Sequence, residues 1–187
     1  MYLDLEKEMA DFLSYVPLEK SHSEVYSPKL VKIILQVGPE ILNAFNLAIG
    51  NINPTAKIDE MFGMSDLSND LSALWTEEAE LRSKKQSLSF KKYYAFLEKY
   101  GFNKPSKAEV QLREKNSLIL TPFKEDFPNW WAVYNSLKHD KYNNLSSATL
   151  FTTLMCLGAL FWMLDCCAED LYIDDGLSSN LFLRKAR

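Results

Sequence analysis

SSATLFTTLMCLGALFWML, residues 146–164, contains no charged residue and is about as long as a bilayer span. Its first third is nonetheless rich in hydroxyl side chains, and it continues directly into the acidic stretch 165–170. Other segments supply apolar helical faces that need a partner, and a helix that is apolar all round fits the centre of a soluble bundle. We therefore expect a long core helix, with its N-cap at Ser146 or Ser147 and its end near Tyr172, and no membrane span.

A second long helix is predicted upstream of this one. Apolar side chains between residues 30 and 49 recur with a helical period. Ser27 is a good N-cap and Pro28 suits the first helical position, so the helix should begin there and continue to Gly50. The period resumes in phase after Gly38, which predicts a kink at that point and not an end.

The remaining elements are shorter. Residues 51–70 are dense in Asn, Pro, Gly, Ser and Asp and indicate a long loop. Three more helices are predicted over residues 3–15, 68–82 and 89–100. A helix is also expected after Pro128, loosening near Asn143.

Two short runs of alternating or branched apolar residues, 110–112 and 118–120, surround a polar turn at 114–116 and predict a two-stranded hairpin. The tail after Gly176 has too little periodicity to place. The expected fold class is therefore all-α: a bundle of five or six helices with one long C-terminal core helix and a small β-hairpin insertion.

Length and composition indicate one globular domain over residues 1–187, because 47% apolar and 25% charged residues lie close to the average of globular proteins. Cys156, Cys166 and Cys167 lack metal-ligand spacing and are interpreted as reduced core thiols. No cofactor or metal is expected. The N-terminus has no basic segment followed by an apolar run, so we expect a cytoplasmic protein. With a net charge of −4, any contact with nucleic acid has to be local.

One strip of side chains has the composition of a binding site. Helical spacing aligns Trp131, Asn135 and His139, with Lys138 and Tyr142 beside His139. An aromatic ring can stack on an RNA base, an amide and a lysine can bind phosphate, and a histidine can transfer a proton near neutral pH. The alternative is that the same strip is a hydrogen-bond network inside the bundle, with Asn135 and His139 connecting helices.

The run WWAVYNSLKHDK, residues 130–141, resembles the HEPN superfamily of small helical bundles. Within it, the run is similar to a group of bacterial proteins with the signature W-x-x-Y-N-x-x-K-H-[DN]-[KR]. The likeness extends to the helix start at residues 26–30, although only about a dozen residues are specific. Catalytic members are typically metal-independent ribonucleases of toxin or defence systems, which form dimers that join two R-x4-6-H motifs.

The resemblance places His139 at the motif histidine and Asn135 at the polar residue that follows the arginine. Tyr134 stands where the arginine should be, and no arginine lies between it and Ala132. A guanidinium would stabilise the negative charge that develops on the phosphate, and a lysine replaces it only as a point charge. The departure therefore favours a degenerate member over an active nuclease.

The sequence thus predicts a HEPN-like homodimer that binds RNA or a nucleotide, as a weak or lost ribonuclease. The residues predicted for catalysis are His139, Asn135 and Lys138, and those predicted to contact RNA are Trp131, Tyr134, Lys141 and Tyr142. The alternative is an interaction or dimerisation module without enzymatic activity. Exposure separates the two hypotheses, because an RNA site needs His139 and Asn135 at the surface.

Overall fold

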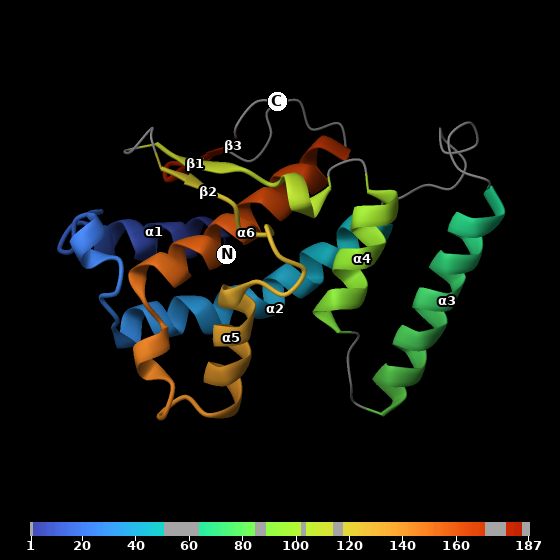
Figure 1. The fold of residues 1–187 in the computed structure, drawn as a ribbon, viewed down its shortest axis with the longest axis horizontal. Helices are drawn as coiled ribbons and strands as arrows, with labels where there is room; N and C mark the ends of the chain where they lie inside the picture. Colours follow the sequence, from blue (N-terminus) through green and yellow to red (C-terminus); the bar gives the residue numbers. More distant parts are fainter. Residues whose placement is uncertain are drawn as a thin grey trace.

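The computed structural model describes residues 2–50, 64–84, 89–101, 104–113, 118–170 and 179–184. These residues form a helical bundle that carries a small antiparallel sheet on one side (Figure 1), which confirms the expected fold class. The helices are α1 (Tyr2–Leu13), α2 (Pro28–Gly50), α3 (Met64–Ser83), α4 (Phe90–Tyr100), α5 (Asn129–His139) and α6 (Leu150–Asp170). The strands are β1 (Val110–Leu112), β2 (Ile119–Leu120) and β3 (Phe182–Arg184).

Helices α2 and α6 form the centre of the bundle and run side by side in the same direction (Figure 1). Backbone hydrogen bonds connect the start of α6 to the segment just before α2. The N–H groups of Leu150 and Phe151 donate to the carbonyls of Val25 and Ser23. Helices α1, α4 and α5 pack around this pair, and α3 stands outside α4 (Figure 1). The apolar stretch that predicted a core helix therefore does lie in the core.

Helix α2 begins as predicted and is not ended by Gly38-Pro39. The Ser27 hydroxyl accepts the N–H of Leu30 at 3.3 Å, which is the expected N-cap bond. The helix then continues through Pro39 to Gly50. By length and composition the segment Pro28–Ile49 could cross a membrane. Half of its most apolar 18-residue stretch is buried inside the bundle.

The start of α6 differs from the prediction. Residues Leu145–Ser147 form a separate 3-10 turn, and the cap is Thr149, whose hydroxyl accepts the N–H of Thr152 at 3.2 Å. Ser147 instead donates its hydroxyl to the Asn144 carbonyl, so it stabilises the preceding turn. The predicted end near Tyr172 lies outside the described residues.

The sheet has one more strand than the predicted hairpin. Strand β1 pairs with β2 as expected, in the register Val110↔Leu120, and also pairs on its other edge with β3. Strand β3 is anchored from far along the chain, because the buried Glu6 carboxylate of α1 accepts hydrogen bonds from the Ser179 hydroxyl and the Leu181 N–H. The prediction of a two-stranded hairpin was therefore incomplete.

The start of α3 and the burial of the cysteines lie closer to the prediction. Helix α3 begins at Met64, four residues before the predicted start, and the rest of the predicted loop, 51–63, lies outside the described residues, as does the hairpin turn at 114–116. Cys156 and Cys166 are buried thiols, as expected.

Candidate functional site

Helix α5 is fixed at its start by a buried tryptophan. The Trp130 indole N–H donates to the Pro122 carbonyl at 2.6 Å, and the side chain is almost fully buried. Its ring meets Phe90 and Phe123 edge to face. The helix therefore enters the bundle at one orientation, which fixes the direction of every later side chain of α5.

Trp131 lies in the core. Only 6% of the residue is exposed, and its ring stacks on Phe90 with centroids 4.7 Å apart and contacts Tyr134 at 4.9 Å. Neither face of the indole is open to an RNA base in this structure, so the predicted stacking role of Trp131 has no exposed ring to support it.

Tyr134, to which the HEPN resemblance gives the position of the motif arginine, is also a core residue. It is 4% exposed, and its ring lies against Gly38 so closely that any side chain at position 38 would overlap it. Burial raises the pKa of the Tyr134 phenol, and the nearby Cys156 thiol raises it further. Tyr134 thus joins α5 to α2 as a neutral aromatic ring and presents no cation to a phosphate.

Asn135 lies between core and surface. It is half-buried, and its side-chain N–H donates to the Trp131 carbonyl one turn back at 3.0 Å. That bond holds the amide against its own helix. His139, one turn further on, is exposed, so the predicted strip runs from the core at Trp131 to solvent at His139.

A compact turn follows α5 and fixes the end of the helix. The Asp140 carboxylate accepts the backbone N–H of Asn143 at 3.3 Å and its side-chain N–H at 2.6 Å. The Asn144 side chain donates to the Asp140 carbonyl at 2.7 Å. Such side-chain bonds to the local backbone define turns in the absence of other structure.

The exposed residues of this turn and of the last helical turn form a surface that we call the α5 tip, residues 138–142. Lys138, His139 and Lys141 are exposed, and the side chain of Tyr142 is almost completely so at 86%. The Lys138 ammonium lies 6.0 Å from the centroid of the Tyr134 ring, at the upper limit of a cation–π contact. The tip therefore presents three basic groups and one free aromatic ring.

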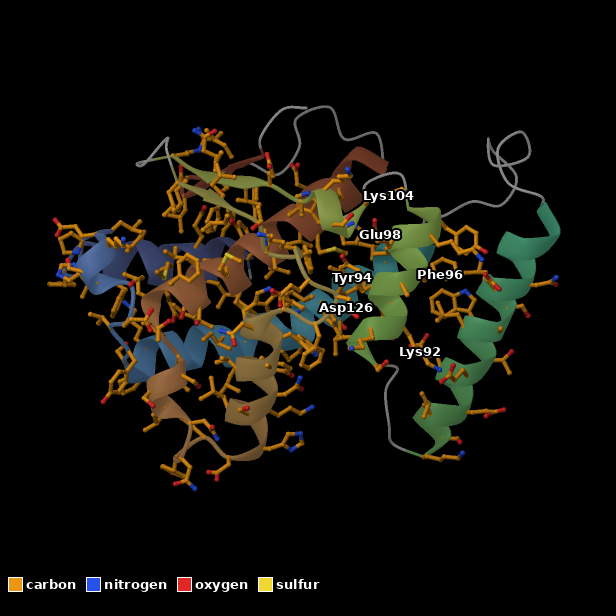
Figure 2. All side chains as sticks on the ribbon, in the orientation of Figure 1. Lys92, Tyr94, Phe96, Glu98, Lys104 and Asp126 are labelled. Carbon is orange, nitrogen blue, oxygen red and sulfur yellow. The ribbon has the colours of Figure 1, made fainter. Side chains whose placement is uncertain are left out.

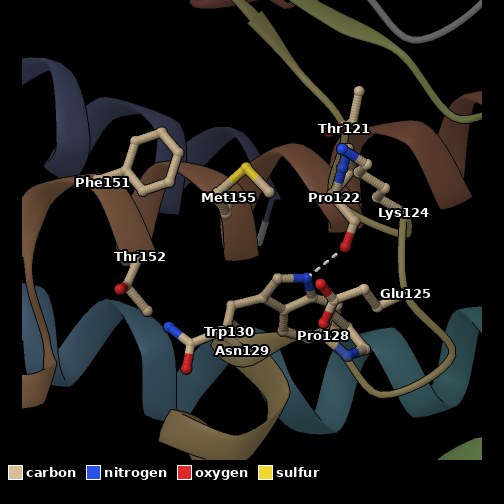
Figure 3. Close-up of a pocket in the computed structure, with 10 residues that line it drawn as sticks. All are labelled: Thr121, Pro122, Lys124, Glu125, Pro128, Asn129, Trp130, Phe151, Thr152 and Met155. Carbon is tan, nitrogen blue, oxygen red and sulfur yellow. Dashed lines mark hydrogen bonds between the residues drawn. The ribbon is translucent and has the colours of Figure 1, made fainter.

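A pocket of about 160 Å³ opens at the other end of α5, between the loop that precedes it and the first turns of α6 (Figure 3). Trp130, Pro122 and Met155 contribute apolar walls, and Asn129 and Glu125 contribute polar groups. Sequence reasoning did not find this pocket. Because α6 is apolar on all sides, its pattern does not show which positions face solvent.

Comparison with protein-family models, with curated proteins and with solved structures gives no match for this chain. The HEPN-like interpretation therefore remains a hypothesis that rests on residues 130–141. Of the seven residues predicted for the site, the structure brings four together at the α5 tip, namely Lys138, His139, Lys141 and Tyr142. It places Trp131 and Tyr134 in the core and Asn135 at the boundary.

Proposed function

We propose that the α5 tip binds single-stranded RNA, and that the protein acts as a binder and not as a nuclease. The observation that carries the proposal is the turn at residues 140–144, which fixes its own backbone by internal hydrogen bonds. The side chains beside it stay exposed: Lys138, His139, Lys141 and Tyr142. The hypothesis of an RNA site required His139 and Asn135 at the surface: His139 is exposed, whereas Asn135 is half-buried and its amide is bonded to the Trp131 carbonyl.

The chemistry of the tip suits a flexible polyanion. Lysine ammonium groups bind phosphate, and a solvent-exposed tyrosine ring can stack on any base. Because the whole chain carries a charge of −4, attraction to RNA has to come from a local group of cations such as the one at the α5 tip. The Asp140 carboxylate lies among them, but both of its oxygens are engaged by Asn143.

Binding without cleavage follows from what surrounds His139. Cleavage by the ribose 2′-hydroxyl needs a base, an acid and a cation fixed at the phosphate. The α5 tip offers one histidine, and the position of the motif arginine is a buried tyrosine. The other histidine of the chain, His22, lies in the 3-10 turn Lys20–His22, where its ring is bonded to the Pro17 carbonyl. In the dimers of the HEPN superfamily a second motif histidine comes from the other copy.

The test is fluorescence anisotropy of a labelled single-stranded RNA of mixed sequence, titrated with protein at several salt concentrations. For the Lys138→Ala/Lys141→Ala variant we expect weaker binding and a salt dependence reduced by about two, one for each phosphate that a lysine no longer neutralises. Tyr142→Ala should weaken binding by about 1–3 kcal/mol, the contribution of one stacked base.

A matched control removes the same charge elsewhere. Lys7 of α1 and Lys20 of the 3-10 turn Lys20–His22, before α2, are both exposed, and the Lys7→Ala/Lys20→Ala variant should leave affinity unchanged. Equal losses in the two double variants would mean that RNA senses only net charge and would refute a site at the tip. No binding by the wild type would favour the alternative, a protein interaction module.

Cleavage is measured on the same RNA in EDTA, with the wild type and His139→Ala side by side. We expect intact RNA in both. Cleavage that depends on His139 would show that an active site exists without the arginine, and the binder proposal would then give way to that of a weak ribonuclease.

A further inference from the structure

The pocket at the start of α5 combines apolar walls with polar side chains that have no hydrogen-bond partner among the described residues. Trp130, Pro122 and Met155 line it, and Phe151 of α6 stands at its side with 43% of its surface exposed (Figure 3). An exposed phenylalanine beside an apolar hollow is a ready surface for a flat ring. At about 160 Å³, the pocket is smaller than the roughly 300 Å³ of the smallest drug-sized sites and suits a single ring system.

Thr121 and Thr152 also line the pocket, and its charged and amide side chains are those of Lys124, Glu125 and Asn129. Among the residues that the structure describes, their side chains have no hydrogen-bond or ion-pair partner, whereas Asp126 of the same loop is paired with Lys91. Figure 3 draws Lys124, Glu125 and Asn129 among the residues that line the pocket. Within the described part of the chain, a carboxylate, an amide and an ammonium without partners thus lie on the loop side of one apolar hollow.

We propose that this pocket binds a nucleobase whose amino group stands at C6 of a purine or C4 of a pyrimidine, that is adenine or cytosine, as one base of the RNA chain. Phe151 would stack on the base, the Glu125 carboxylate would accept from its amino group, and Asn129 would bond to the neighbouring donor or acceptor on the same edge. Lys124 would bind the attached phosphate. Uracil has a carbonyl where these bases have the amino group, and a carbonyl facing Glu125 would be repelled.

This inference rests on the proposed function but extends it from the phosphate chain to base identity. Pocket and α5 tip lie at opposite ends of one short helix, about 15 Å apart for ten residues at 1.5 Å each. Residues 143–151 connect them along the chain, through the turn, the 3-10 turn and the start of α6. One short RNA strand could therefore contact the tip with its phosphates and place a base in the pocket.

The test follows the methyl group of Met155 by NMR in protein labelled at its six methionine methyls, with Met155→Leu to assign the signal. The probes are adenosine, cytidine and uridine monophosphates. Because Met155 lines the pocket, a bound ring should shift its methyl signal. We expect a saturable shift with the adenosine and cytidine nucleotides, and at least tenfold weaker binding of the uridine nucleotide.

Two exposed phenylalanines provide a matched pair of variants. Phe151→Ala should reduce the affinity for adenosine monophosphate at least tenfold, whereas Phe127→Ala should not change it. Phe127 is 41% exposed, and it does not line the pocket. Glu125→Gln keeps the shape of the side chain but adds an N–H donor, so the preference for the amino-bearing bases over uracil should be lost.

The outcomes separate this inference from the proposed function. If RNA binds through the α5 tip while no nucleotide shifts Met155, the pocket proposal is overturned and the RNA-binding proposal stands. If nucleotides shift Met155 while RNA does not bind, the pocket is a nucleotide site and the RNA proposal fails. Equal shifts with uridine monophosphate, or unchanged binding by Phe151→Ala, would overturn the assignment of the pocket to amino-bearing bases.

Discussion

The two ends of α5 carry similar residue types in opposite environments. The aromatic rings of Trp131 and Tyr134 are packed against Phe90, against each other and against Gly38, and the two residues are 6% and 4% exposed. Tyr142, just past the other end, is 86% exposed. The difference shows that one continuous run of sequence can supply both the anchor of a helix and the surface that the anchor positions. It also gives a test, because the same substitution should act on stability at one end and on RNA at the other.

The largest expected effect is on stability. Tyr134→Ala removes a buried ring and leaves a cavity between α5 and Gly38, and truncation of a buried aromatic residue typically costs ~3–5 kcal/mol. Tyr142→Ala changes only the surface and should stay within ~0.5 kcal/mol of the wild type. The free energy of unfolding in urea, followed by circular dichroism, measures both.

RNA affinity should distinguish the two variants in a different way from stability. Tyr142→Ala should lose RNA affinity while the fold is intact. A Tyr142→Ala protein that unfolds as readily as Tyr134→Ala would contradict the division of α5 into a buried and an exposed end, since it would place both rings in the core.

A smaller loss of stability is expected from a substitution at Gly38, the α2 side of the contact with Tyr134. The methyl group added by Gly38→Ala would overlap the Tyr134 ring. Overpacking of a core costs ~1–3 kcal/mol, and alanine in a helix regains ~1 kcal/mol relative to glycine. We therefore expect a net loss of ~2 kcal/mol or less, measured by the same urea titration.

Gly38→Ala should stabilise the protein, and no longer destabilise it, when the Tyr134 ring is absent. In the Tyr134→Ala background, Gly38→Ala meets no ring, so the gain in helix propensity should remain and part of the cavity should be filled. If Gly38→Ala destabilised both backgrounds equally, the close approach of α2 and α5 would not be made by Tyr134.

The helices of this fold could be predicted because each is encoded locally. The apolar period of α2, its cap at Ser27 and the uncharged stretch of α6 are properties of neighbouring residues. Strand β3 could not be predicted, since three residues are too few for a pattern. It is placed by bonds from Ser179 and Leu181 to Glu6, more than 170 residues earlier.

The arrangement of the candidate site was predicted in part, because helical spacing is also a local property of the sequence. Helical spacing correctly aligned Trp131, Asn135 and His139 on one strip, but spacing does not tell how far into the bundle each end of the strip lies. The cap of α6 was misplaced because Ser147 and Thr149 are both good capping residues, and only the turn bond from Ser147 to Asn144 decides between them.

The smallest expected effect is the contribution of the Tyr134 phenol to the pH dependence of stability, which appears only at alkaline pH. Burial raises the pKa of Tyr134 in the folded protein, and a tyrosine in the unfolded chain titrates near pH 10. Above that pH the unfolded chain has lost a proton that the folded chain still holds, so stability falls as pH rises. Below pH ~9 the phenol is protonated in both states and contributes no pH dependence.

Tyr134→Phe removes this contribution, so its stability should fall less than that of the wild type between pH 9 and pH 11 (~1 unit either side of the free tyrosine value). It should not become constant, because burial also raises the pKa of Tyr2, and Tyr2 keeps its phenol in the variant. Tyr142→Phe, which removes a phenol from a side chain that is 86% exposed, is the matched control. Urea midpoints at the two pH values give the comparison. Parallel losses in all three proteins would mean that the Tyr134 phenol can ionise without leaving the fold, which its packing between Gly38 and Trp131 does not permit.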